Sequence, residues 1–351
     1  MVDTKKTSSR GSALQKLKTD LKTGRPASAY IFYGEESYLR EYYLGELRKK
    51  LIPPGSETFN SHRLEGKELT AQTLAEAVEA MPMLAERTLI SVIDWDIFKL
   101  GENQREKLIA LLEDLPPYCC VVFVYDTLEY KPNKTMKKLC KALDAYVEAV
   151  EFQAASSAEL LPWIARRFKA LGKEIDRNTA EYLAFVCGGL MTGLVPEIEK
   201  IAAYAKGPSI TRKDVDAVAD PVLSAKVFKL SDEVIQGNYD KAASTLGDLL
   251  KMQTEPIVIL AALGSQLRRI WTARLALDSG RDRLWLMDLW GLRSNFQVNQ
   301  LFDAARRTSG EWCAGAVRQC QILDRRMKSE RGVNNGDELK LLLVRLAAER
   351  R

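Results

Sequence analysis

The sequence predicts an α/β domain with a mostly parallel sheet, followed by two all-helical domains. Up to about Phe152, short apolar runs rich in β-branched and aromatic residues alternate with segments of helical period, which is typical of strands joined by crossover helices. From Ser156 onward the strand signals stop and helix signals replace them. The 351 residues also exceed one ordinary core, so we expect two or three domains.

The first domain is predicted to contain five strands and four intervening helices. Strict alternation of the two implies a mostly parallel sheet that is covered on both faces. Apolar residues recur at helical spacing over 39–51, 74–81, 108–115 and 136–143. The expected strands are Ala29–Tyr33, Thr58–Leu64, Arg87–Ile93, Cys119–Tyr125 and Tyr146–Phe152.

Local signals divide the chain into four parts. Residues 1–14 are polar and are expected to form a flexible tail, and the sheet domain is expected over 15–152. Ser156 and Glu159 have capping-box spacing and open a small helical domain over 153–221. A larger helical domain over 222–351 includes a long helix that begins at Glu255-Pro256.

Composition narrows the class of protein. The net charge of +5 permits contact with nucleic acid without arguing for it. Six cysteines without a C-x-x-C pair indicate small buried hydrophobic residues in a reducing compartment. No signal peptide and no run of ~18 apolar residues is present, so we expect an intracellular protein without a membrane span. A single histidine, His62, rules out a multi-histidine metal site.

The stretch from Tyr30 to Arg40 has the layout of a nucleotide-binding strand, loop and helix without the residues that hold a phosphate. A working P-loop places Lys and Ser or Thr after its glycines. Here Gly34 is followed by the carboxylates Glu35 and Glu36, which we interpret as a solvated helix N-terminus. We therefore expect no bound nucleotide at this degenerate P-loop position and an NTPase-like frame that serves as a binding module.

A second NTPase element is also incomplete. Asp126 follows the strand near 119–125, but Thr127 stands where a catalytic glutamate would activate water. Asp126 could bind a metal, although a turn at the end of the strand explains it more simply. No catalytic residue and no resident metal are therefore expected.

Four residues between the second helix and the third strand are the candidate partner-binding site: Met81, Pro82, Met83 and Leu84. Pro82 cannot continue a helix and moves Met81 out of helical geometry, which places Met83 and Leu84 on a projecting loop. Thioether and branched aliphatic side chains suit a preformed apolar pocket on a partner. The alternative is that Met83 and Leu84 pack beneath their own domain.

Several segments together resemble the delta subunit family of the bacterial DNA polymerase III clamp loader, a non-ATPase AAA+-like family. The resemblance extends over nearly the whole chain beyond the tail. It is carried, in order, by Tyr30–Glu36, Ala80–Arg87, Glu255-Pro256-Ile257, Leu323–Ser329 and Glu338–Leu342.

The resemblance implies an AAA+-like domain, a helical lid and a collar domain that oligomerises. It implies a subunit that binds the beta sliding clamp through Met81–Leu84 and opens its ring for loading onto primed DNA. The other expected partners are the gamma/tau and delta-prime subunits, which the collar would contact, in the cytoplasm at the replisome. The subunit would have no cofactor and no catalysis of its own within a DNA-directed DNA polymerase holoenzyme. Many relatives have an aromatic residue at the position of Leu84, so we expect a similar pocket with a less tightly filled end.

Two other functions remain open at this stage, namely an ATP-binding clamp-loader subunit and a DNA- or RNA-binding adaptor that works without a clamp. Both could use basic residues, and DNA contact by the paired arginines competes with surface solvation or salt bridges between subunits. Tryptophans of the last domain, such as Trp290 and Trp312, are expected mainly in its core. The arginine pairs are Arg166-Arg167, Arg268-Arg269, Arg306-Arg307 and Arg325-Arg326.

Overall fold

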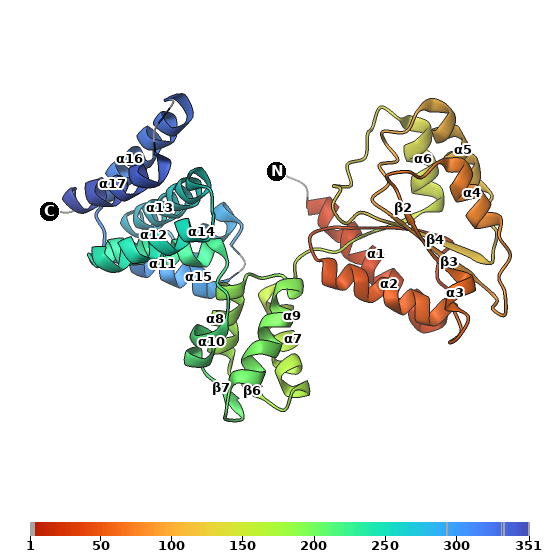
Figure 1. The fold of residues 1–351 in the computed structure, drawn as a ribbon, viewed down its shortest axis with the longest axis horizontal. Coiled ribbons are helices and arrows are strands. Elements are labelled where there is room, and N and C mark those ends of the chain that lie inside the picture. The colour runs from red at the N-terminus through yellow and green to blue at the C-terminus, as the bar shows by residue number, and fades with distance from the viewer. Residues whose placement is uncertain (1–3, 293, 331, 333, 350–351) are drawn as a thin grey trace. The chain divides into compact units, whose positions relative to one another are not determined.

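The protein is described from a computed structural model that covers residues 4–292, 294–330, 332 and 334–349. The chain divides into two compact units, Met1–Ala154 and Ala155–Arg351 (Figure 1). The boundary lies within two residues of the predicted end of the sheet domain. The further division of the second unit into lid and collar remains a prediction.

The first unit is built on a parallel five-stranded sheet, which confirms the predicted fold class. The strand order is β2-β3-β4-β1-β5, and every neighbouring pair is parallel. Strands β3 and β4 are buried along their whole length, as expected of a sheet covered on both faces. The strands are β1 (Ala29–Tyr33), β2 (Ser61–Glu65), β3 (Thr88–Ile93), β4 (Cys119–Val124) and β5 (Glu148–Glu151).

Helices cover the two faces of this sheet and form two separate cores. On one face lie α4 (Ala71–Glu79), α5 (Glu102–Glu113) and α6 (Lys137–Tyr146) (Figure 1). On the other lie α1 (Thr4–Thr23) and α2 (Ser37–Leu51). Alternate residues of the strands point to opposite faces, so each face is filled by its own set of apolar side chains.

Two elements of the first unit differ from the prediction. The expected flexible tail over residues 1–14 is wrong in its extent, because helix α1 begins at Thr4, while residues 1–3 lie outside the described part. Leu17 is buried against the sheet with Leu14 and Leu21 beside it, and helix elongation then adds one hydrogen bond per residue. The predicted strand Thr58–Leu64 begins instead with a single helical turn, α3 (Glu57–Asn60).

The second unit is almost entirely helical. Its first helix begins at the predicted cap. The carboxylate of Glu159 accepts hydrogen bonds from the backbone N–H and hydroxyl of Ser156, and Asp176 and Thr211 cap the N-termini of two further helices. These helices are α7 (Ser157–Ala170), α8 (Arg177–Cys187), α9 (Met191–Tyr204) and α10 (Arg212–Val218). A short parallel pair, β6 (Glu174–Ile175) and β7 (Ser209–Ile210), was not predicted.

Within the described residues from 223 onward, seven helices share one apolar core. The long helix begins with Pro256 in its first turn, as the sequence predicts. Among the described residues no single helix is long and apolar enough to cross a membrane, and α8 with α9 meets the length and composition test only as a pair bent by 118°. The seven helices are α11 (Leu223–Gln236), α12 (Tyr239–Lys251), α13 (Pro256–Asp278), α14 (Arg283–Trp290), α15 (Asn295–Arg306), α16 (Gly310–Ser329) and α17 (Asn335–Ala348).

Candidate functional site

The degenerate P-loop position is closed against the end of strand β5. Gly34 has φ of +117°, and a Cβ atom built on it would lie 2.3 Å from the carbonyl oxygen of Phe152. The backbone N–H of Glu36 donates a hydrogen bond to that same oxygen over 3.0 Å. Only glycine tolerates both the backbone angle and the close approach. The glycine here thus serves packing between the loop and the edge strand.

The side chain of Arg40 fills the inside of this loop. Its guanidinium is buried, donates a hydrogen bond to the carbonyl oxygen of Gly34 over 2.8 Å and forms an ion pair with Asp126. Glu36 is also fully buried, so the interpretation of Glu36 as a solvated carboxylate is wrong, whereas Glu35 is exposed and accepts a hydrogen bond from the backbone of Ala154. Burial follows because the loop folds onto Phe152. The guanidinium of Arg40 thus lies inside the loop that follows β1.

The side chain of Asp94 holds the turn that follows strand β4. Asp94 follows β3 with φ of +52° and accepts hydrogen bonds from the backbone N–H groups of Asp126, Thr127 and Leu128 and from the hydroxyl of Thr127. Burial raises the pKa of Asp94, but these hydrogen bonds outweigh burial and hold that pKa below its usual value. Asp126 and Thr127 therefore belong to a fixed turn that presents Asp126 to Arg40.

The four candidate partner-binding residues lie in an irregular loop between α4 and β3. Met81, Met83 and Leu84 are 78%, 56% and 88% exposed, and Pro82 is half-buried between them. Packing of Met83 and Leu84 beneath their own domain is therefore excluded. Leu84 has φ of +57°, a left-handed conformation that a branched side chain rarely adopts. Such strain is characteristic of functional sites.

A buried amide holds the middle of this loop. The Asn60 side chain accepts a hydrogen bond from the Met83 backbone N–H over 2.8 Å and donates one to the Met83 carbonyl oxygen over 2.7 Å. It also donates to the carbonyl oxygen of Ser56 within its own helical turn, α3. At the start of the loop the hydroxyl of Tyr118 donates to the carbonyl oxygen of Glu79. The exposed tips thus project from a backbone that is tied to the domain.

The sequence predicted the exposure of Met83 and Leu84. It did not reveal the residues that hold the loop after β1 and the loop between α4 and β3. Asn60 lies inside a predicted strand, and the sequence places Arg40 only at the end of the P-loop-like stretch. Their partners, Met83 and Asp126, are 23 and 86 positions away along the chain. No short-range pattern marks such pairs. Asn60 stands among other polar residues, Ser61, His62 and Arg63, so its own segment does not single it out.

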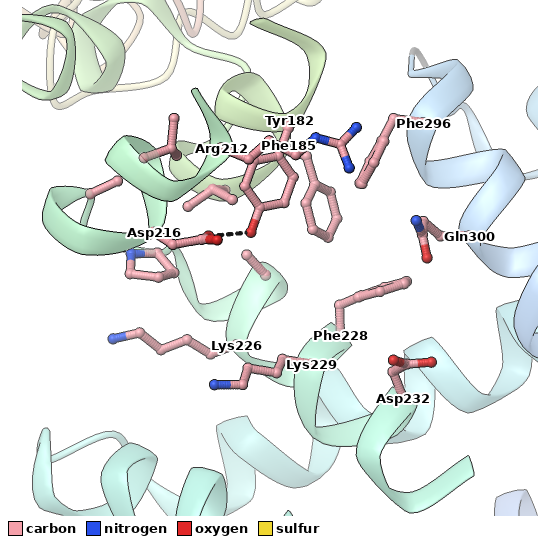
Figure 2. Close-up of a pocket in the computed structure, with 15 residues that line it drawn as sticks. Tyr182, Phe185, Arg212, Asp216, Lys226, Phe228, Lys229, Asp232, Phe296 and Gln300 are labelled. Carbon is pink, nitrogen blue, oxygen red and sulfur yellow. Dashed lines mark hydrogen bonds between the residues drawn. The ribbon is translucent and has the colours of Figure 1, made fainter. Parts of the chain in front are cut away.

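A cavity of about 600 Å³ in the second unit lies among helices α8, α10, α11 and α15. Figure 2 shows the guanidinium of Arg212 beside the rings of Tyr182 and Phe296, at 5.2 and 5.7 Å from their centroids. Lys226 and Asp232 line the same cavity, so its charges are of both signs. The arrangement joins helices of the predicted lid to helices of the predicted collar through aromatic and cation–π contacts.

The arginine pairs make contacts within their own chain. Burial lowers the pKa of Arg269, whose guanidinium lies over the ring of Trp290. DNA contact by any of these arginines stays a prediction. The internal partners are Trp163 for Arg167, Trp290 for Arg269, Asp232 for Arg307 and both Glu330 and Glu338 for Arg326.

The cysteines match the interpretation as small apolar residues. All six are free thiols, and only Cys140 is partly exposed. Burial raises the pKa of Cys120 to about 12, which keeps its thiol protonated and unreactive. His62 lies on strand β2 as predicted. Within the described residues, no three His, Cys, Asp or Glu side chains are grouped so that they could hold a metal ion.

The parallel sheet covered by helices, the helical second unit and the arginine-filled loop define an α/β protein with a degenerate P-loop position. A model of the DNA polymerase III delta subunit matches residues 30–153, and a model of the C-terminal domain of that subunit matches residues 224–346. Together the matches span more than half of the chain. The chain therefore belongs to the DNA polymerase III delta subunit family, a component of the clamp loader, which confirms the resemblance found in the sequence.

Full-length relatives support this assignment. The chain is 25% identical to the DNA polymerase III subunit delta of Bacillus subtilis over 334 residues, which cover 93% of each chain. It is also 25% identical to the probable DNA polymerase III subunit delta of Aquifex aeolicus over 303 residues, or 84% of each chain. The solved structure of the Bacillus subtilis DNA clamp loader delta protein is similar in fold, with a TM-score of 0.53 at 24% identity, over 95% of this chain and 99% of that one.

Proposed function

We propose that this chain binds the beta sliding clamp through Met81, Pro82, Met83 and Leu84 and opens its ring for loading onto primed DNA. One observation carries the proposal: large apolar side chains stand exposed on a loop whose backbone is tied to the domain by a buried amide. Exposed apolar side chains that gather at one place mark interaction sites. A few anchors of this kind can supply most of the binding free energy.

The size of these anchors is sufficient for a specific complex. Complete burial of each large apolar side chain contributes about 1.5–3 kcal/mol. Met83 and Leu84 together would thus contribute roughly 3–6 kcal/mol, which is about 10²- to 10⁴-fold in affinity. The left-handed backbone at Leu84 directs its side chain away from its own domain, where it is 88% exposed.

We further propose that this subunit does not hydrolyse ATP and that the motor activity resides in the gamma/tau subunits. Support comes from the loop after β1, where the buried Arg40 pairs with Asp126 and the N–H of Glu36 bonds to Phe152. These contacts use groups that would otherwise meet a phosphate. The sequence also lacks a Ser-Arg-Cys triplet with which to present an arginine to a neighbouring ATP.

We propose that the helices from α11 onward assemble with gamma/tau and delta-prime in the cytoplasm, around primed DNA. Exposed apolar side chains on this part of the chain support the proposal, because burial of apolar surface drives association between subunits. These side chains are Val258, Leu275, Leu284, Leu289, Ile322, Leu341 and Val344.

The decisive experiment replaces both Met83 and Leu84 with alanine in the full-length chain and measures binding to the sliding clamp of its own organism. We expect affinity to fall at least 100-fold (about 2.7 kcal/mol) with a melting temperature near that of the wild type. Leu171→Ala is the matched control, since Leu171 is an exposed apolar residue in the second unit. Unchanged affinity in the double variant would contradict the proposal.

A further inference from the structure

We propose that Asn60 is a positioning residue for clamp binding: its buried amide fixes the loop backbone so that Met83 and Leu84 are already in the binding conformation in the free protein. This inference rests on the proposed function, because it names the residue that prepares the same site. Asn60 itself is fully buried and would touch no partner.

The hydrogen bonds of Asn60 determine the orientation of its amide. Its two N–H groups are directed at the carbonyl oxygens of Ser56 and Met83, and its oxygen accepts the N–H of Met83. A reversed amide would bring donors to a donor and an acceptor to acceptors, so one orientation is favoured. The pair of bonds to Met83 resembles the pairing of a backbone peptide. These two bonds hold both the N–H and the C=O group of Met83 at the centre of the loop.

The backbone of Leu84, the residue after Met83, explains why the loop needs the hydrogen bonds of Asn60. Leu84 adopts a left-handed backbone conformation while its side chain is almost entirely in water, so the packing of that side chain does not hold it. Strained conformations persist where surrounding contacts over-determine them. Asn60 supplies such contacts at the preceding residue. A loop that is ordered before binding loses less conformational entropy on binding.

Ser56, the N-cap of the short helix α3, offers a matched control for a merely structural role. Ser56 is buried like Asn60 and donates its hydroxyl to the carbonyl oxygen of Pro53 over 2.9 Å. Ser56→Ala therefore removes a part-buried hydrogen bond next to the same helical turn but leaves both bonds to Met83 in place. Asn60→Ala removes those two bonds. Asn60→Asp removes the donors at nearly constant volume.

The test measures clamp affinity, thermal stability and amide hydrogen exchange of full-length variants. We expect Asn60→Ala to weaken clamp binding about 10-fold or more and to speed exchange over residues 81–87. Ser56→Ala should lower thermal stability with less than a 2-fold change in affinity. If Asn60→Ala does not fold, Asn60→Asp has the same expected outcome.

A double-mutant cycle separates this inference from the proposed function. When Met83 and Leu84 are already alanine, Asn60→Ala should cause no further loss of clamp affinity, although it should still lower thermal stability. Wild-type affinity in Asn60→Ala, or equal losses in Asn60→Ala and Ser56→Ala, would overturn the positioning role alone. Wild-type affinity in the Met83 and Leu84 double variant would overturn the proposed function itself.

Discussion

At the scale of single residues, one carboxylate organises the carboxyl end of two adjacent strands. Asp94 follows β3 and receives three backbone N–H groups and one hydroxyl from the turn after β4. That turn contains Asp126, the partner of Arg40. The conformation of the degenerate P-loop position thus depends on hydrogen bonds to the charged form of Asp94.

The pKa of Asp94 leads to a prediction of pH dependence. Because this pKa is lower in the folded state than the unfolded value of about 3.9, the stabilisation is complete above pH ~4 and is lost as pH falls through the folded pKa. We expect Asp94→Asn, which tolerates positive φ, to lower the free energy of unfolding by about 1–3 kcal/mol at pH 7. Urea midpoints between pH 7 and 3 should show the gap to the wild type narrowing below pH 4. A gap independent of pH would refute this explanation.

At the scale of elements, the sequence was sufficient where periodicity is strong. Strands β1, β3 and β4 and helices α2, α4, α5 and α6 follow from apolar spacing, because burial on one or two faces of an element dictates its period. Prediction failed where a contact distant in sequence decides the structure. Asn60, the last residue of α3, bonds to Met83, and Leu17 of α1 is buried against the sheet.

In the candidate site, too, local features could be predicted from the sequence and long-range features could not. Pro82 predicts a turn and hence the exposure of Met83 and Leu84, since proline acts on its immediate neighbours. The left-handed backbone of Leu84 and the burial of Glu36 could not be predicted. Both result from the folding of loops onto residues more than 20 positions away, which no local pattern encodes.

The close approach of Gly34, in the loop between β1 and α2, to Phe152 at the end of β5 leads to a prediction of stability. Gly34→Ala would place a methyl group against the Phe152 carbonyl at positive φ, so we expect a loss of about 2–4 kcal/mol in the free energy of unfolding. Gly45→Ala is the matched control, because Gly45 lies in α2 with open space around its Cβ position and should gain about 0.5–1 kcal/mol. Chemical denaturation measures both. Similar changes in the two variants would show that the close approach at Gly34 is unimportant.

At the scale of the whole molecule, the chain consists of two units with separate apolar cores. The cores on the two sheet faces belong to the first unit, and the large core from residue 223 onward belongs to the second. Chains with several cores commonly unfold in more than one step. The proposed clamp-binding loop lies in the first unit, whereas the proposed assembly surface lies in the second.

Separate cores predict that the two units can be destabilised separately. Leu17→Ala removes a buried side chain from the first unit and Leu267→Ala removes one from the second, each at about 2–5 kcal/mol. Calorimetry should therefore show a different transition lowered in each variant. At a temperature below both transitions, Leu267→Ala should bind the clamp like the wild type, because it leaves the first unit folded. If either substitution lowered all transitions equally, the chain would unfold as one cooperative body and the independence of the two units would be refuted.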